Sequence, residues 1–481
     1  MRIFVVSMIL FLSIFSASAQ NVIHIRNAKI GDPYWSLEDI KMPKPKRWKK
    51  LWDIPEHPAF DNFVTEQVKD SLLLLINEIN GKYTLDSLRT SDLMRIFKPY
   101  LDWLRYIDPH YFVYFQPNFS SGTAAKKNIE AFNRKYCRYL PFTCLNINDT
   151  LLVQTSIDEQ FKYGDRLLSI NGCEVSEMIQ YSQFERRFLP VYLLCNYYGH
   201  DFSRKFDVVI QRDNNIMTLH SDNCKMSAIT KIFQKEEIYN SENRRYYSEY
   251  QTGYIKISQF YPVNTLLIKT IRKSLLNFKK NGAKNIILDL RGNSGGNGSN
   301  WDELMGIFID KDSIRVQSAP VLRVSKYTLG YDFAKKEDIG HNVVFPEGEY
   351  YGSIPLKRAN YVAGLNYYVL MDKSTHSTAA TFCNVLQFNG AAKLVGEPLL
   401  HNALKYGEVI CPVRRFPNKS FPGNMIESSI STVEFNEYTK AVDGILMPDI
   451  IIPYVAKEYM SGDDSILSKL LLNKISGWNL N

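Results

Sequence analysis

The sequence predicts a multidomain α/β protein, and three observations lead to this fold class. A chain of 481 residues is too long for one hydrophobic core. From about Gly253 to Pro453, short apolar strands alternate with helical segments, which is typical of a layered domain with parallel strands. Two differently patterned units precede that region. The first has apolar residues at helical spacing, and the second has short strands joined by tight turns.

The first residues have the pattern of a signal peptide, which we assign to residues 1–19. A basic start is followed by an apolar run from Ile3 to Phe15 and by the small residues Ala17 to Ala19. No later segment approaches about 18 consecutive apolar residues. We therefore expect export to the periplasm or the extracellular space, without stable insertion into a membrane.

The helical unit is expected within residues 20–125. Apolar residues recur at helical spacing from Phe63 to Ile76 and again from Leu93 to Leu104. Pro109 ends the second run, and alternating aromatic residues from Tyr111 onward indicate a strand.

The small β-domain is expected within residues 126–235. Its central pattern is a Gly164-Asp165 turn, an apolar strand and a tight Asn171-Gly172 turn. This segment resembles a PDZ domain, and a generic hairpin is the alternative. The resemblance implies that Leu140, Pro141 and Phe142 lie near a peptide-binding loop, since PDZ domains add a bound peptide to a sheet edge.

Composition and charge exclude several classes of function. The net charge of +8 is modest, and the densest basic stretch, Lys41 to Lys50, contains two prolines and is interpreted as a linker. The sequence lacks zinc-finger spacing and RNP-type aromatic runs, so we expect no nucleic-acid partner.

The seven cysteines show no metal-ligand spacing, so no metal is predicted. Scattered carboxylates without a supporting motif argue against a carbohydrate-active enzyme.

The α/β domain is expected within residues 245–456, with a helical tail at 457–481. Its predicted strands are 254–257, 285–290, 367–371 and 393–396, and its predicted helices are 266–278 and 378–388.

A glycine-rich loop follows the buried strand at 285–290. It reads Asp289-Leu-Arg-Gly-Asn-Ser-Gly-Gly296. Glycines let backbone N–H groups approach an anion closely, so this loop can form an oxyanion-binding nest. It lacks the Gly-Lys-Ser/Thr of a phosphate-binding P-loop and the spacing of a dinucleotide loop.

The second motif places a serine at the start of a predicted helix. Ser377 follows the strand at 367–371, and the N–H of Thr378 is free for an oxyanion in such a position. The alternative is that Ser377 or Ser374 caps the helix.

Taken together, the two motifs and the Leu-Val-Gly-Glu-Pro segment at 394–398 resemble the tail-specific, C-terminal-processing serine proteases, including the tricorn-like branch. The resemblance covers most of the mature chain. It implies a protease domain of the ClpP/crotonase type, a PDZ-like domain and no cofactor. It also implies Ser377 as nucleophile, with an oxyanion hole from Gly295 or Gly296 and Thr378.

The resemblance leaves two routes to a general base. One branch uses a lysine after the Val-Gly-Glu strand, but here Asn402 occupies about that position, and Lys405 and His401 lie nearby. The tricorn-like branch uses a histidine from a short Asp-x-His motif after the helical unit. Asp108-Pro109-His110 fits that motif, so we favour His110.

A late acidic residue orients the catalytic apparatus in tricorn-like members. Glu434, Glu437 and Asp443 all lie near the corresponding segment, and we favour Glu437. The predicted function is an exported serine endopeptidase that binds peptide or protein tails. The alternative is an inactive relative that binds a peptide or an apolar ligand. No pattern in the sequence indicates an oligomeric state.

Overall fold

The computed structural model describes a large part of the chain. The described residues are 34–36, 56–59, 87–89, 104–117, 140–176, 179, 205–222, 224, 228, 241–260, 263–296, 298–348, 351–410, 413–417 and 422–475. The predicted signal peptide and most of the predicted helical unit lie outside these residues.

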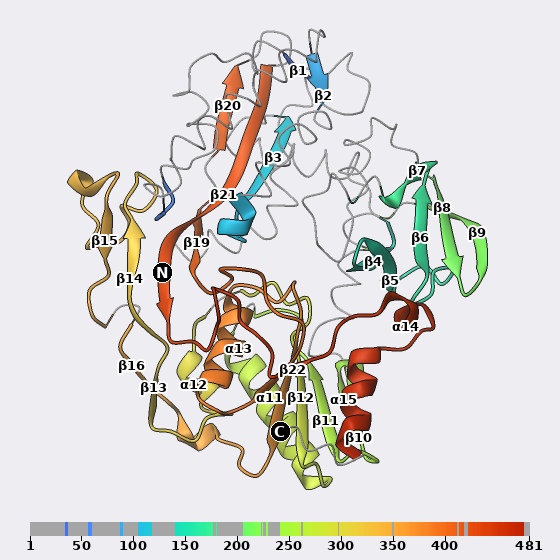
Figure 1. The fold of residues 1–481 in the computed structure, drawn as a ribbon. Coiled ribbons are helices and arrows are strands. Elements are labelled where there is room, and N and C mark those ends of the chain that lie inside the picture. The colour runs from blue at the N-terminus through green and yellow to red at the C-terminus, as the bar shows by residue number, and fades with distance from the viewer. Residues whose placement is uncertain are drawn as a thin grey trace.

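A mainly parallel sheet forms the centre of the α/β domain (Figure 1). In the described part of the chain its strand order is β10-β11-β12-β17-β18-β22, and β10 alone is antiparallel to its neighbour. These strands are Arg244–Tyr247, Thr252–Lys256, Asn285–Asp289, Asn366–Met371, Lys393–Gly396 and Ile450–Ile451. The pattern of short apolar strands and intervening helices therefore predicted this α/β layer correctly.

Helices α11 (Thr265–Lys280), α12 (Trp301–Met305) and α13 (Thr378–Phe388) connect these strands. α11 and α13 contribute buried residues to the same core cluster as Ile286 and Leu288 of β12. Successive residues of a strand point to opposite faces. Accordingly Ile287, between these two, packs into a second cluster with the C-terminal helices α14 (Ala456–Met460) and α15 (Ser465–Ile475). The sheet is thus covered on both faces.

A second sheet lies beside the first and is built around the long strand β21 (Pro422–Glu437). β21 pairs with β14 (Gln317–Arg323), β19 (Tyr406–Ile410), β20 (Val413–Pro417) and β3 (Phe112–Pro117). β15 (Asn342–Val344) pairs with β14. The β3 pairing joins a strand from before the β-domain to the last third of the chain (Figure 1).

The β-domain contains the antiparallel order β4-β5-β6-β8-β9, with β7 paired to β6, within the described residues. These strands are Phe142–Ile147, Thr150–Ser156, Arg166–Ile170, Lys205–Arg212, Asn215–Asp222 and, for β7, Cys173–Glu174. Asn171 and Gly172 both have positive φ, at 49° and 75°, as a type I′ hairpin requires. The predicted Asn-Gly turn is therefore confirmed.

The β-domain packs against the C-terminal segment. Gly164 approaches so closely that a Cβ there would lie 2.3 Å from the backbone oxygen of Tyr459 in α14. Ile147 and Leu152 of the β-domain share a core cluster with α14 and α15. The C-terminal segment therefore lies between the β-domain and the central sheet (Figure 1).

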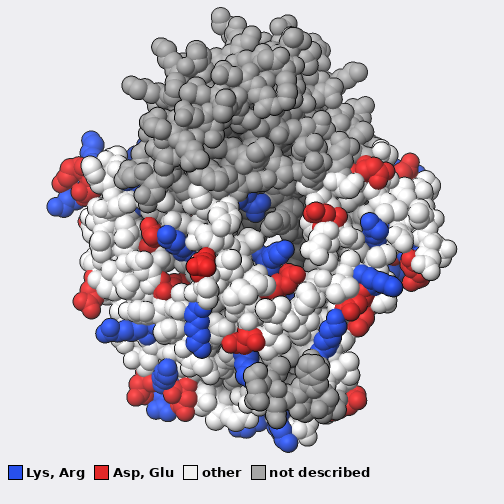
Figure 2. Space-filling model, in the orientation of Figure 1, with Lys and Arg blue, Asp and Glu red and all other residues white. Residues whose placement is uncertain are grey.

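Two short antiparallel strand pairs lie outside these sheets. In one, β1 (Tyr34–Ser36) pairs with β2 (Ser87–Arg89), and in the other, β13 (Ser313–Arg315) pairs with β16 (Ser353–Pro355). On the face shown in Figure 2, basic and acidic side chains are interspersed over the described surface. A search of the described residues found no helix with the length and apolarity needed to cross a membrane.

Candidate active site

The two predicted motifs meet at one edge of the central sheet. β12 ends at Asp289 and β17 ends at Met371, and the two strands are parallel neighbours with Asp289 opposite Leu370. Because the carboxyl ends of adjacent parallel strands lie side by side, the loops that follow them are brought together. The glycine loop and the serine loop are those two loops.

Asn293 ties the two loops to each other. Its fully buried side chain donates from Nδ2 to the Ile257 oxygen (2.8 Å) and accepts at Oδ1 from the Gly295 N–H (2.8 Å). Its backbone oxygen accepts from the N–H of His376 (2.9 Å). The residue next to Ser377 is thus fixed to the glycine loop. The importance of Asn293 was missed at the sequence level, although it stands inside the quoted motif.

Ser377 adopts an unusual backbone conformation at the start of α13. Its φ is 55° and its ψ is −130°, and its side chain makes no capping hydrogen bond to the helix. The alternative interpretation, a helix-capping serine, is therefore wrong for Ser377. A non-glycine residue held at positive φ costs about 1–3 kcal/mol, and such strain is found where a side chain must be presented at a site. The same sharp strand-to-helix turn presents the serine of α/β-hydrolases.

The glycine loop lies directly against Ser377. A methyl group on Gly295 would be 2.7 Å from the His376 oxygen, 2.8 Å from Ser377 Cβ and 2.9 Å from Thr378 N. Only glycine therefore fits at this position, which also has a φ of 96°.

Gly296 is the residue of the loop that faces outward. The Gly295 N–H is already bonded to Asn293 Oδ1, and Gly295 is buried, whereas Gly296 is exposed. The Thr378 hydroxyl donates to the Gly296 oxygen (2.9 Å), which holds Gly296 beside the first turn of α13. Of the two predicted glycine donors, this geometry favours Gly296, together with the N–H of Thr378.

His110 reaches this region from a distant part of the sequence. Its ring centroid lies 4.1 Å from that of His376, the residue before the serine. The His110 side chain is buried, and neither of its ring nitrogens has a hydrogen-bond partner among the described residues. The Ser429 hydroxyl of β21 donates to the His110 backbone oxygen. β21 therefore helps to hold the histidine segment in place.

Asp108 organises the histidine segment. Its Oδ1 lies 3.3 Å from His110 Nδ1 and accepts from the His110 N–H (2.9 Å). The Ser431 hydroxyl and N–H contact the same carboxylate at 3.1 and 3.2 Å. Burial raises the pKa of Asp108, but its contacts with His110 and His57 outweigh burial and hold that pKa well below its usual range. Asp108 is therefore an ionised partner for His110.

His57 completes the group around Asp108. Its Nε2 lies 3.1 Å from Asp108 Oδ2, and its Nδ1 accepts from the Ala59 N–H (3.1 Å). This pairing assigns the ring proton to Nε2, where it points to the carboxylate. Asp108 and His57 were not among the predicted site residues. The Asp-x-His motif contained the signal for Asp108, whereas the sequence carried none for His57.

The alternative bases have other partners. Lys405 Nζ lies 3.4 Å from Glu434 Oε1. His401 Nδ1 lies 3.2 Å from the Tyr106 oxygen, and its ring stacks on that of Tyr106 with centroids 4.4 Å apart. Asn402 Nδ2 donates to the Ile107 oxygen (3.0 Å). The loop expected to carry a catalytic lysine thus anchors the segment that leads to His110.

Glu437 lies behind the helix that begins at Ser377. Its Oε1 accepts from the Thr381 hydroxyl (2.7 Å) and its Oε2 accepts from Asn384 Nδ2 (2.8 Å). Desolvation raises its pKa to about 7, against the lowering effect of these two bonds. The described contacts of Glu437 are therefore with α13 rather than with His110, and those of Glu434 are with Lys405. Asp443, at a φ of 49°, is exposed.

The predicted peptide-binding residues form part of the core of the β-domain. Leu140 and Phe142 are almost completely buried, each with 1% of its surface exposed, and both belong to the apolar cluster of this domain. The Pro141 oxygen accepts from the Ile157 N–H (2.9 Å) and from the Ser156 hydroxyl (3.1 Å). The side chains of Leu140 and Phe142 thus face the domain interior, and the expected role of this segment in peptide binding stays a prediction.

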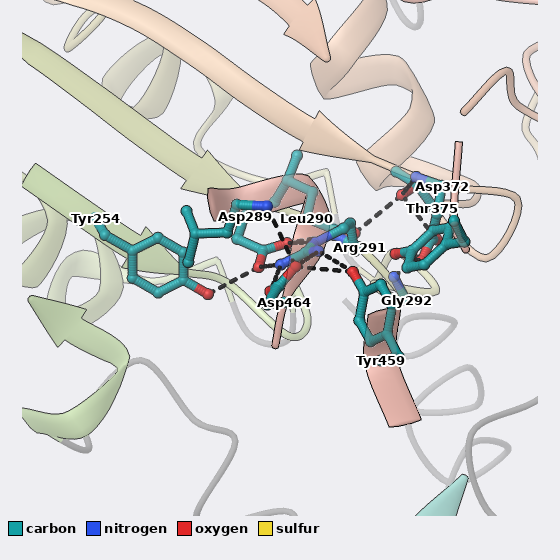
Figure 3. Close-up of polar contacts among 11 residues, drawn as sticks. Tyr254, Asp289, Leu290, Arg291, Gly292, Asp372, Thr375, Tyr459 and Asp464 are labelled. Atoms are coloured by element: carbon teal, nitrogen blue, oxygen red, sulfur yellow. Dashed lines mark hydrogen bonds and ion pairs between the residues drawn. The ribbon is translucent and has the colours of Figure 1, made fainter. Parts of the chain in front are cut away.

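A buried ionic network underlies both loops (Figure 3). Arg291 donates from Nε and Nη2 to the Asp289 carboxylate (2.9 and 2.6 Å) and from Nη1 and Nη2 to the Asp464 carboxylate (2.8 and 2.6 Å). Tyr254 donates to Asp289 (2.7 Å). Burial opposes the ionised form of Asp289, but the adjacent Arg291 holds its pKa far below the usual value.

A strained serine at a helix start, an apposed glycine loop and a histidine–aspartate pair are the parts from which a serine-hydrolase site is built. The sequence model of peptidase family S41 matches residues 251–449, which contain both loops. This part of the chain is therefore similar to a family of serine peptidases, in agreement with the resemblance to tail-specific proteases found in the sequence.

Two solved structures of CPAF share the overall fold. Mature CPAF aligns with a TM-score of 0.55 at 14% identity and covers 92% of this chain and 98% of its own. Mature CPAF complexed with lactacystin gives 0.56 at 15% identity, with the same coverage. The photosystem II D1 C-terminal processing protease gives 0.41 at 12% identity, covering 87% and 97%. No curated protein matches the chain significantly.

Proposed function

We propose that this chain is an exported serine endopeptidase that cleaves peptide bonds through an acyl-enzyme on Ser377. The observation that carries the proposal is the closeness of three parts in the structure. Ser377 is turned out of its helix, the glycine loop lies in contact with it, and the His110 ring packs on the adjacent His376.

His110 is the proposed general base. Asp108 faces its Nδ1, which favours the tautomer with a proton on Nδ1 and a lone pair on Nε2. Nε2 then accepts the proton of the Ser377 hydroxyl as its oxygen attacks the substrate carbonyl. When the tetrahedral intermediate collapses, the same proton passes to the leaving amine. Water, deprotonated by His110 in turn, releases the acyl group and regenerates Ser377.

The N–H groups of Gly296 and Thr378 are the proposed oxyanion hole. Thr378 follows Ser377 at the positive end of α13, and its hydroxyl bonds to the Gly296 oxygen. Loss of one such donor typically costs about 3 kcal/mol of transition-state stabilisation. Glu437 supports this arrangement from behind, since its bonds to Thr381 and Asn384 fix the second turn of the same helix.

We further propose that the β-domain is PDZ-like and captures the substrate as an extended segment. Its order β4-β5-β6-β8-β9 leaves β4 and β9 at the outside of the sheet within the described residues. An outer strand can pair with an added peptide strand. The buried side chains of Leu140 and Phe142 would then shape the domain, and the recognition would be made by backbone groups.

Replacement of Ser377 by alanine tests the proposal. The wild type should hydrolyse an unfolded protein such as fluorescein-labelled casein and should react with a fluorophosphonate probe. Ser377→Ala should do neither, while its circular dichroism and thermal unfolding remain those of a folded protein. Equal turnover by the two proteins would refute the assignment. Peptide binding without turnover by the wild type would favour a binding protein.

A further inference from the structure

We propose that the C-terminal segment from Tyr454 to Asp464 is a working part of the active site, with Asp464 as a positioning residue for the oxyanion hole. This inference rests on the proposed function of Ser377. It concerns a segment after the last strand of the central sheet, outside the residues that match the family model.

The first contact is with the glycine loop. Arg291 immediately precedes Gly292, and its guanidinium is held between two carboxylates (Figure 3). Asp289 is a local partner two residues away, whereas Asp464 comes from 173 residues further along the chain. The Tyr459 hydroxyl accepts from Arg291 Nη1 (3.2 Å) and donates to Asp464 Oδ1 (2.7 Å). A two-sided, bidentate arrangement of this kind fixes the plane of a guanidinium.

The second contact is with the serine loop. The Tyr454 hydroxyl donates to Asp372 Oδ2 (3.0 Å). The other oxygen of Asp372 accepts from the N–H groups of Gly292 and Ser374, each at 2.9 Å. Asp372 therefore joins the beginnings of the two loops, and the C-terminal segment holds both of them.

Folding stability alone does not account for this polar network. Tyr459, Ile466 and Leu470 are at most 2% exposed and pack into the apolar cluster beneath the sheet. That packing already secures the segment. The Asp464 side chain is 29% exposed, and an ion pair that keeps this much contact with solvent adds little to stability. We therefore infer that the charged side chains serve to fix the position of the Arg291 end of the glycine loop relative to Ser377.

Asp464→Asn is the informative variant. Asparagine keeps the shape of the side chain and still accepts the Leu467 N–H bond at the start of α15 (3.2 Å). It removes the negative charge and one of the acceptors for Arg291. Asp463→Asn is the matched control, because Asp463 is the adjacent exposed acid and bonds to Ser468 within α15.

We expect Asp464→Asn to lower kcat on labelled casein about tenfold and to leave KM unchanged, since misplacing a catalytic group by about 1 Å can cost roughly 100-fold. Fluorophosphonate labelling of Ser377 should slow similarly, because its phosphoryl oxygen enters the oxyanion hole. Tyr459→Phe should have a smaller effect of the same kind. Asp463→Asn should match the wild type in both assays.

The inference is overturned if Asp464→Asn, folded as judged by circular dichroism, labels as fast as Asp463→Asn, or if KM alone changes. Should Asp464→Asn not fold, an unchanged labelling rate in Tyr459→Phe overturns it equally. A wild type that neither turns over nor labels defeats the proposed function and the inference together. A wild type that is active with an inactive Ser377→Ala, but with no effect of Asp464→Asn, defeats the inference alone.

Discussion

Replacing Glu437 by glutamine should stabilise the protein above neutral pH. Glu437 is half-buried, and desolvation raises its pKa from 4.5 to about 7. Between these values the folded state binds more protons than the unfolded state, so stability is lost as the pH rises through about 7. Glutamine resembles the protonated acid at every pH. It can also accept from Asn384 and donate to the hydroxyl of Thr381, which already bond to Glu437.

The size of the effect follows from the shift. One pKa unit corresponds to about 1.4 kcal/mol, so the change from 4.5 to about 7 sets an upper limit of about 3 kcal/mol. Solvent contact of the half-buried side chain reduces this, and we expect about 1–2 kcal/mol at about pH 8. The difference should shrink as the pH falls toward 4.5, where the unfolded-state carboxyl also binds its proton.

Urea unfolding at a series of pH values, in a Ser377→Ala background that prevents self-digestion, measures this difference. The free energy of unfolding of the Glu437→Gln variant should exceed that of its parent at about pH 8 and should approach it at about pH 5. A variant that is equally or less stable than its parent at the higher pH would show that Glu437 is ionised there at no cost. The reasoning from desolvation would then be wrong.

Two further predictions concern the serine and its base. His57→Ala should lower kcat, because Asp108 loses the contact with His57 that helps to hold its carboxylate beside His110. His57→Gln, which restores an N–H near the position of Nε2, should recover most of the lost kcat, and His220→Ala, which breaks an exposed His–Asp pair in the β-domain, should leave kcat unchanged. Gly295→Ala should reduce kcat by at least about 100-fold, since its methyl group would overlap Ser377 and Thr378. Gly352→Ala has a similar positive φ but open space around its Cβ, so an equal loss of activity there would contradict the proposed contact.

Local features of the chain could be predicted well. The strands β12, β17 and β18 and the helix α13 lie within a residue of their predicted limits, because apolar periodicity and a glycine-rich or polar end are encoded in adjacent residues. The placement of Ser377 at the start of α13 was confirmed for the same reason. Its positive φ was not predicted, since the surrounding packing imposes it.

The long-range contacts of the site could not be read from the sequence. His57 meets Asp108 across 51 residues, and Ser431 meets it across 323. Such pairs depend on which strands become neighbours, and the sheet around β21 was not predicted. Glu437 illustrates the difference. The resemblance favoured it as the acid that orients the catalytic apparatus, and that role stays a prediction. Its partners on α13 depend on the pairing of β21 with β14, which the sequence does not indicate.

Strand β21 also has a consequence for the biosynthesis of the protein. It carries Ser429 and Ser431, which hold the histidine segment, and it ends at Glu437, which braces the helix of Ser377. A ribosome makes the chain from the N-terminus, so His110 and Ser377 both exist before this strand does. We therefore expect the proposed site to assemble only after β21 has been made and has paired, and the nascent chain should show no cleavage before that point.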